Sequence, residues 1–354
     1  MSYIISLIIV LGVLIFFHEL GHFLVARLCG VGVEKFSLGF GPRLLGKTIG
    51  LTDYRISAIP LGGYVKMVGE EPDADLEPEM IPLSFTHKNV FKRILIVASG
   101  PAFNLLLAVL IYFSLFQFYG SYELEPVVGK VMADSPAMKS GLKQGDRILS
   151  LDGAVVTSFS QLAEIVSRSN GKTIIFTIKR GDAKNEIPIT PEKKADLNEF
   201  GEDVNRYLVG ISPSGEHYRT IQYSPLGAIT QSISQTYTIS KLMIVGIVKL
   251  IKGDISAKNL GGPIMIAQMA GDQAKQGLSS LFNFIAFISV NLAIVNFLPI
   301  PVLDGGHLLF FLVEALTRRP VNIRMREIAQ QVGIFILILL TLFVFYNDIM
   351  RLLS

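Results

Sequence analysis

The chain has 354 residues, of which 50% are hydrophobic and only 17% are charged, whereas an average globular protein has about 25% charged residues. The net charge of +3, without a patch of basic and aromatic residues, argues against a nucleic-acid partner. A single cysteine, Cys29, excludes a disulfide framework and a thiolate metal site. These values indicate an integral membrane protein that carries some soluble mass.

The first predicted element is a membrane-spanning helix at about residues 3–27, within a first segment of residues 1–30. Residues 4–17 carry no charge, as a helix in a bilayer requires. We expect this span to be retained, because it has neither a basic leading segment nor a small-residue cleavage site.

A metal-binding type of motif, HELGH at 18–22, lies inside this apolar helix. His18 and His22 are one turn apart on the same face, so their side chains can hold one Zn²⁺. Glu19 between them can act as a base on water. Ionisable residues in hydrocarbon are costly and usually functional. The alternatives are a soluble zinc-protease helix with an unusually apolar flank and a coincidental motif in a membrane protein.

Residues 31–69 are predicted to form short strands and hairpins. Glycine and proline interrupt partly alternating apolar residues at 36–42, 54–60 and 61–67. Such hairpins can dip into a membrane where protein covers their backbone, although a hairpin at the cytoplasmic surface would have the same pattern. Residues 70–92 are predicted to be an acidic, solvated cytoplasmic loop.

A second span is predicted at residues 93–120. It contains GPAFN at 100–104, which places a lone amide, Asn104, in an apolar helix. Asn104 either forms a hydrogen bond between helices or helps to polarise the scissile carbonyl of a substrate. The sequence leaves both roles open.

Residues 121–213 are predicted to form one soluble α+β domain. Its expected elements are a strand, a short helix, a strand with an Asp-Gly turn, a longer helix and a strand, at 126–131, 135–141, 147–153, 159–167 and 173–180. This order resembles a circularly permuted bacterial PDZ domain. The resemblance places a loop for a peptide carboxyl terminus at Leu208, Val209, Gly210 and Ile211, beside an edge that accepts a peptide strand. A domain that only restricts access is the alternative.

Residues 214–276 are predicted to be amphipathic linker helices. Residues 224–252 have helical spacing, and their apolar patch is flanked by Lys241, Lys249 and Lys252. This composition favours a helix at the membrane interface over a fifth span.

The third predicted span, residues 277–306, ends in a segment that contains Pro299, Pro301 and Asp304. The prolines are expected to unwind the helix, and the glycines after Asp304 let backbone approach a metal or a substrate closely. Asp304 is the only acid near the end of an uncharged run, and a zinc ion held by the two histidines of the first span is its best partner. Capping of the following helix is the alternative.

Two further polar residues belong to this region. Asn296 is expected to contact substrate, because it precedes the unwound segment, with a helix–helix hydrogen bond as the alternative. His307 is a rival metal ligand or a residue on the substrate side. Residues 307–327 are predicted to be a cytoplasmic loop, and residues 328–354 are predicted to hold the fourth span and the C-terminus.

The basic residues predict the orientation of the spans. Loops rich in lysine and arginine stay in the cytoplasm, and the two loops that follow the first and third spans contain Lys35, Arg43, Lys47, Arg55, Lys66, Lys88, Lys92, Arg93, Arg318, Arg319, Arg324 and Arg326. Both termini and residues 121–213 then lie outside the cytoplasm. The HELGH motif and Asp304 lie at a similar depth, toward the cytoplasmic side.

Six motifs along the chain closely resemble the site-2 proteases, in the RseP-like form found in bacteria. They recur in the family's order over essentially the whole chain, as HELGH at 18–22, FSLGFGP at 36–42, IPLGGYVKM at 59–67, GPAFN at 100–104, GGPIMIAQ at 261–268 and NFLPIPVLDGGH at 296–307. In one departure, the best-known RseP-type enzymes have two tandem PDZ domains, and this chain has room for one.

The resemblance implies an intramembrane zinc metalloprotease with one Zn²⁺ per chain. Zinc would be bound by His18, His22 and Asp304, and Glu19 would be the general base. The implied fold is a polytopic α-helical membrane protein of about four spans, with a membrane-reentrant β-hairpin region and one inserted α+β PDZ-like domain.

The resemblance also describes the substrate. Residues 31–69, with Gly62, Gly63 and Tyr64, would present the substrate as an added strand. Substrates would be single-span membrane proteins already cut on the extracytoplasmic side, such as an anti-sigma factor or a signal-peptide remnant. The setting would be the lipid bilayer of a bacterial inner membrane.

Two rival functions use the same residues. A zinc transporter or membrane scaffold would keep His18, His22 and Asp304 without hydrolysis. A transporter is expected to place polar ligands along a path through the bilayer, whereas here they cluster at one depth beside Glu19. A membrane-anchored protease for soluble peptides is the second rival.

Overall fold

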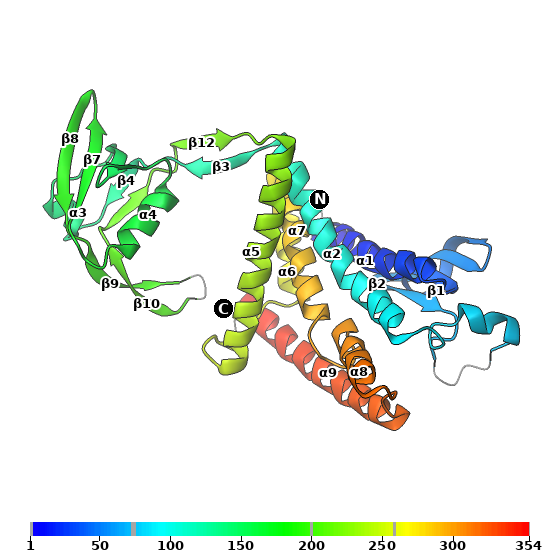
Figure 1. Ribbon diagram of the computed structural model, residues 1–354. Coiled ribbons are helices and arrows are strands. Elements are labelled where there is room, and N and C mark those ends of the chain that lie inside the picture. The colour runs from blue at the N-terminus through cyan, green and yellow to red at the C-terminus, as the bar shows by residue number, and fades with distance from the viewer. Residues whose placement is uncertain (1–2, 72–75, 199–200, 258–259, 354) are drawn as a thin grey trace. The chain divides into compact units, whose positions relative to one another are not determined.

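The computed structural model describes residues 3–71, 76–198, 201–257 and 260–353 (Figure 1). The chain divides into two compact units. The helical unit comprises residues 1–115, 226–251 and 256–354, and the PDZ-like unit comprises residues 116–225 and 252–255.

Four helices in the described part of the chain are long and apolar enough to cross a membrane. They are α1 (Tyr3–Leu28), α2 (Val90–Phe118), α7 (Leu278–Asn296) and α9 (Ile323–Leu353), and they match the four predicted spans. Two further helices, α5 (Pro225–Lys252) and α6 (Pro263–Gln276), fill the predicted linker. α5 is not among the candidate spans, as its amphipathic pattern predicts.

The core of the helical unit joins α1, α2, α6 and α7. Its buried side chains are Val10, Leu14, Leu107, Ala270, Leu281, Phe284 and Ile285. Small residues let membrane helices approach closely, and α1 and α2 meet at such a residue. A Cβ atom on Gly21 of α1 would lie 2.4 Å from the carbonyl oxygen of Ser99 on α2. This contact fixes the two helices at short distance where α1 carries its histidines.

The predicted β region consists of two long antiparallel strands, β1 (Val33–Ile49) and β2 (Thr52–Met67). The beginning of β1 pairs on one side with the end of β2 and on the other with its beginning. Four segments therefore lie side by side, in the order 63–67, 33–38, 53–57 and 43–48. Segment 63–67 is one edge of this sheet, and within the described residues no strand pairs with its outer side.

Residues 307–327, predicted as a loop, mostly form a helix instead. α8 (Asp304–Thr317) begins directly after the Pro299–Pro301 turn. A Cβ atom on Gly306 would lie 2.4 Å from the carbonyl oxygen of Ile300, so the turn requires glycine there. The apolar run after Gly306 is too short for a span, which is why hydropathy missed it. The predicted loop at 70–92 likewise contains a 3₁₀ helix, η1 (Pro78–Leu83), and the start of α2.

The PDZ-like unit contains the predicted order of strands and helices. Its elements are β3 (Ser121–Leu124), β4 (Val128–Val131), α3 (Pro136–Lys139), β5 (Arg147–Leu151), β6 (Ala154–Val155), α4 (Phe159–Arg168), β7 (Ile174–Arg180), β8 (Ala183–Ile189), β9 (Glu192–Leu197), β10 (Asp203–Leu208), β11 (Ile211–Pro213) and β12 (Tyr218–Ile221). The main sheet has the order β6-β5-β7-β8, β11 pairs with β4, and β9 pairs with β10. The unit extends beyond residue 213, because β12 pairs with β3.

Asp348 of α9 is a fully buried carboxylate at the start of α6. It accepts hydrogen bonds from the backbone amides of Gly262 and Ile264, both at 3.0 Å, and of Met265 at 3.2 Å. The first amides of a helix have no acceptor within the helix. Asp348 supplies one and so ties α9 to α6.

We expect Asp348→Ala to lower the thermal unfolding midpoint in lipid. Unpaired buried amides cost about 1–3 kcal/mol. A matched control is Ile349→Ala on the same helix, where the side chain is exposed. Equal unfolding midpoints for the two variants would contradict the role of Asp348.

Candidate metal centre and active site

The HELGH residues lie on two consecutive turns of α1. The helix has no proline and an apolar sequence on both sides of the motif, so its backbone hydrogen bonds continue through the polar residues. His22 is buried with 7% of its surface exposed, and the His18 side chain is 13% exposed. Both imidazoles are therefore largely covered by other parts of the protein.

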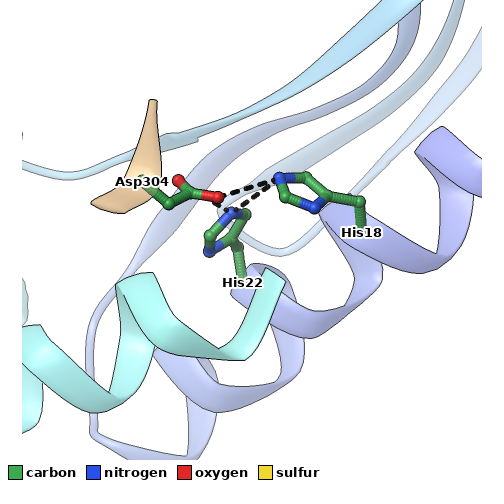
Figure 2. Close-up of side chains that lie close together, drawn as sticks. All are labelled: His18, His22 and Asp304. Carbon is green, nitrogen blue, oxygen red and sulfur yellow. Dashed lines mark hydrogen bonds and ion pairs between the residues drawn. The ribbon is translucent and has the colours of Figure 1, made fainter. Parts of the chain in front are cut away.

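Three donor atoms from α1 and α8 converge at this point (Figure 2). His18 Nε2 lies 3.3 Å from His22 Nε2 and 3.2 Å from Asp304 Oδ2, and His22 Nε2 lies 3.5 Å from Asp304 Oδ1. Tetrahedral zinc with bonds of about 2.0–2.1 Å places neighbouring donors roughly 3.3–3.4 Å apart. The three residues thus fit zinc and leave a fourth position for water or substrate. Among the described residues, no other group of this kind is found.

Asp304 contributes to this cluster as a carboxylate. Its Oδ2 faces His18 Nε2 and its Oδ1 faces His22 Nε2. The residue that caps α8 is Leu303, and no side chain makes a capping hydrogen bond there. The carboxylate of Asp304 therefore faces the two histidines rather than capping its helix.

The face of α2 that meets the histidines is shaped to receive them. His22 Nδ1 lies 2.9 Å from the carbonyl oxygen of Ile96, so this nitrogen donates and Nε2 is left for a metal. A Cβ atom on Gly100 would lie 2.3 Å from His22 Nε2 and 2.8 Å from His18 Cε1. Only glycine leaves room for both rings at that position.

Glu19 lies between the donor cluster and the free edge of the sheet. It is not one of the three clustered donors, and it lines the same cavity as Val65 of that edge. A Cβ atom on Gly63 would lie 3.2 Å from Glu19 Cγ. The edge segment 63–67 thus passes directly beside the acid.

A cavity of about 740 Å³ opens onto this arrangement. Its wall contains the four polar residues of the site, His18, Glu19, His22 and Asp304, together with edge residues Gly63 to Met67. A chain lying along the edge would therefore pass both the metal position and the base. The rest of the lining is mixed, with charged side chains beside apolar ones: Glu70, Arg93, Arg326, Glu327, Phe85, Val97, Phe310 and Phe311.

Only some of the other predicted substrate-contacting residues line the cavity. Gly63, Tyr64 and His307 line the cavity, whereas Gly62, Asn104 and Asn296 are not among its described lining residues. Asn104 is fully buried, and Asn296 is the last residue of α7. Tyr64, which lines the cavity, also stacks on Phe40, with ring centroids 6.1 Å apart.

The predicted PDZ peptide loop joins β10 to β11. Leu208 ends β10 and Ile211 begins β11, while Val209 is buried in the core of the unit. The carbonyl groups of Val209 and Gly210 accept hydrogen bonds from the backbone amides of Ala137 and Met132. The loop is therefore tied to α3 and its approach.

The sequence analysis did not predict a network of ion pairs that lies beside the cavity. Arg93 of α2 makes a two-pronged ion pair with Glu314 of α8, and Arg326 of α9 lies 3.6 Å from the same carboxylate. Its signal in the sequence is Glu314, a lone acid in the apolar run that follows Gly306. The ion pairs connect three helices, and both arginines line the cavity.

The sequence model of peptidase family M50 matches residues 6–340 of this chain. The chain belongs to this family, the site-2 proteases. A relative from Mesorhizobium japonicum, whose name places it among the zinc metalloproteases, is 39% identical over 98% of each chain. A similarly named relative from Campylobacter jejuni is 39% identical over 98% of this chain and 93% of its own length.

The regulator of sigma-E protease RseP from Salmonella typhimurium is 33% identical, over 98% of each chain. That alignment runs over 443 positions, 89 more than the 354 residues of this chain, so RseP has residues without a counterpart here. Among solved structures, the PDZ domain of an SdrC-like protein from Listeria monocytogenes matches 25% of this chain and 87% of its own, with 23% identity and a TM-score of 0.20.

Membership of the family establishes the type of enzyme. The chain is a zinc metalloprotease, and four of its helices are long and apolar enough to cross a membrane. Zinc is its cofactor.

Proposed function

We propose that this protease cuts peptide bonds inside the membrane-spanning segments of other proteins, with zinc held by His18, His22 and Asp304. The observation that carries the proposal is that both histidines lie on α1, a helix long and apolar enough to span a bilayer, with Asp304 within hydrogen-bonding distance. A site at this depth is reached by a substrate that is itself in the membrane.

The residues divide the chemistry between them. Zinc, when bound, supplies a Lewis acid that activates water and polarises the scissile carbonyl. Glu19 takes the proton of the attacking water and passes it to the leaving amine.

The free edge at 63–67 is proposed to bind the substrate as an additional strand. A helix hides its carbonyl groups in its own hydrogen bonds, so a transmembrane helix must unwind before it is cut. The edge offers backbone donors and acceptors to the unwound chain, and Gly63 brings that chain close to Glu19. Residues 31–69 are proposed to lie within the membrane as a reentrant structure, with Gly62, Gly63 and Tyr64 facing the substrate.

The PDZ-like unit is proposed to lie on the extracytoplasmic side and to control which substrates approach. Leu208, Val209, Gly210 and Ile211 would bind a peptide carboxyl terminus there. The substrates would be single-span proteins already cut outside the membrane, such as an anti-sigma factor or a signal-peptide remnant. The enzyme would lie in a bacterial inner membrane with its active site toward the cytoplasm.

The test compares one scissile sequence in two forms, as a single-span peptide in vesicles and as a short peptide in detergent. We expect preferential cutting of the spanning form. N-methylation of successive substrate amides should block cutting at every second position near the cut, since alternate residues of a strand point their amides toward the partner. Equal cutting of the soluble peptide, or no alternation, would contradict the proposal.

A further inference from the structure

Asn104 of α2 is a fully buried amide next to a metal-site histidine. Its side chain is 0% exposed, and its Nδ2 lies 3.3 Å from His18 Nδ1. Its Oδ1 is buried and makes no hydrogen bond within the described structure. Because the side chain does not reach the cavity, it is unavailable to a substrate carbonyl.

The tautomer of His18 decides whether Asn104 must offer it a hydrogen-bond donor or an acceptor. His18 turns Nε2 toward His22 and Asp304, so a metal is bound through Nε2. A neutral imidazole that binds metal through Nε2 carries its proton on Nδ1. That proton requires an acceptor, whereas the amide nitrogen of Asn104 is a donor.

Rotation of the Asn104 amide by half a turn gives the His18 proton an acceptor and the buried amide oxygen a partner. The oxygen and nitrogen of an amide are assigned from the hydrogen-bond network and not from atom positions. In the rotated form, Oδ1 accepts from His18 Nδ1, and the buried oxygen gains a partner. A buried acceptor without a partner next to a donor without an acceptor would be destabilising.

The two histidines are then supported in the same way by α2. His22 Nδ1 donates to the carbonyl oxygen of Ile96, and His18 Nδ1 donates to Asn104. Ile96, Gly100 and Asn104 are four residues apart, so they form one face of the helix, with the space at Gly100 occupied by the imidazoles. The hydroxyl of Ser289 on α7 donates to the backbone carbonyl oxygen of Asn104 at 2.7 Å. This hydrogen bond fixes this part of α2.

We infer that Asn104 is a positioning residue for His18, acting as the hydrogen-bond acceptor that sets its tautomer and ring orientation. This inference rests on the proposed role of His18 as a zinc ligand. Partners that orient metal-bound histidines usually change metal affinity about 10–100-fold when they are removed.

The test measures zinc affinity by competition with a chelator for two variants in lipid. Asn104→Leu has nearly the same shape but no acceptor, and its zinc dissociation constant should rise about 10–100-fold. Asn104→Asp keeps the acceptor and loses the donor, so it should bind zinc about as tightly as the wild type. Asn291→Leu on α7 is the matched control, because the Asn291 amide donates to the Phe287 carbonyl of its own helix.

The thermal unfolding midpoint of each variant separates loss of zinc from loss of fold, and Asn104→Ala is a second variant without an acceptor. Unchanged zinc affinity in Asn104→Leu and Asn104→Ala, or equal loss in Asn104→Asp, would overturn the inference. His18→Ala tests the underlying proposal separately. If His18→Ala loses zinc and Asn104→Leu does not, only the role of Asn104 fails.

Discussion

Glu19→Gln is expected to stop cleavage and leave the zinc content unchanged. Glu19 faces the same cavity as the three clustered donors but is not one of them. Glutamine has nearly the same shape but cannot take a proton from water. General bases contribute about 10²–10⁴-fold to rate, so kcat/KM should fall by at least that lower factor. Zinc per chain and cleavage of a single-span substrate are measured on the same preparation.

The matched control for this variant is Glu77→Gln, which removes an exposed carboxylate outside the cavity. It should cut at the wild-type rate. A Glu19→Gln protein that still cut, or that lost its zinc, would remove Glu19 from the role of base. A zinc transporter or scaffold would be little changed by either substitution.

Gly100→Ala is expected to weaken zinc binding although it adds only one methyl group. The new carbon would lie 2.3 Å from His22 Nε2 and 2.8 Å from His18 Cε1. The ring of His22 is also held by the Ile96 carbonyl, so it cannot move away without losing that hydrogen bond. Overpacking of this kind costs about 1–3 kcal/mol, or roughly 5- to 150-fold in the zinc dissociation constant.

Gly12→Ala provides the comparison for Gly100→Ala. Gly12 is also a helical glycine in a span, and among the described residues nothing beyond its own stretch of helix lies within 4 Å of the position its Cβ would take. Its zinc affinity and its cleavage rate should match the wild type. Gly100→Ala with wild-type zinc affinity would show that the rings are free to shift, and would contradict the close fit of α2 to the site.

The spans and the donor types were predictable because each has a local signal. Hydropathy alone identifies α1, α2, α7 and α9, and the four-residue spacing of His18 and His22 places both on one helix face. Asp304 could be proposed as their partner because a lone acid in an apolar region requires one, and the predicted topology brought it to the same depth.

The remaining parts depend on contacts between distant segments. The support of His18 by Asn104 joins residues 86 apart in sequence, and that of His22 comes from the Ile96 backbone carbonyl, which no side-chain pattern reveals. The double pairing of β1 creates the free edge at 63–67, whereas the sequence indicated only separate short strands. Helix α8 was missed because its apolar run is shorter than a span.

Removal and return of the metal in lipid test the central claim most directly. Zinc per chain and cleavage of a single-span substrate are measured before chelation, after it and after zinc is added back. We predict one zinc per chain, loss of cutting when zinc is removed and recovery when it returns. Two results would contradict an intramembrane zinc protease built on His18, His22 and Asp304. One is cleavage that continues after chelation, and the other is an active preparation that contains no zinc before chelation.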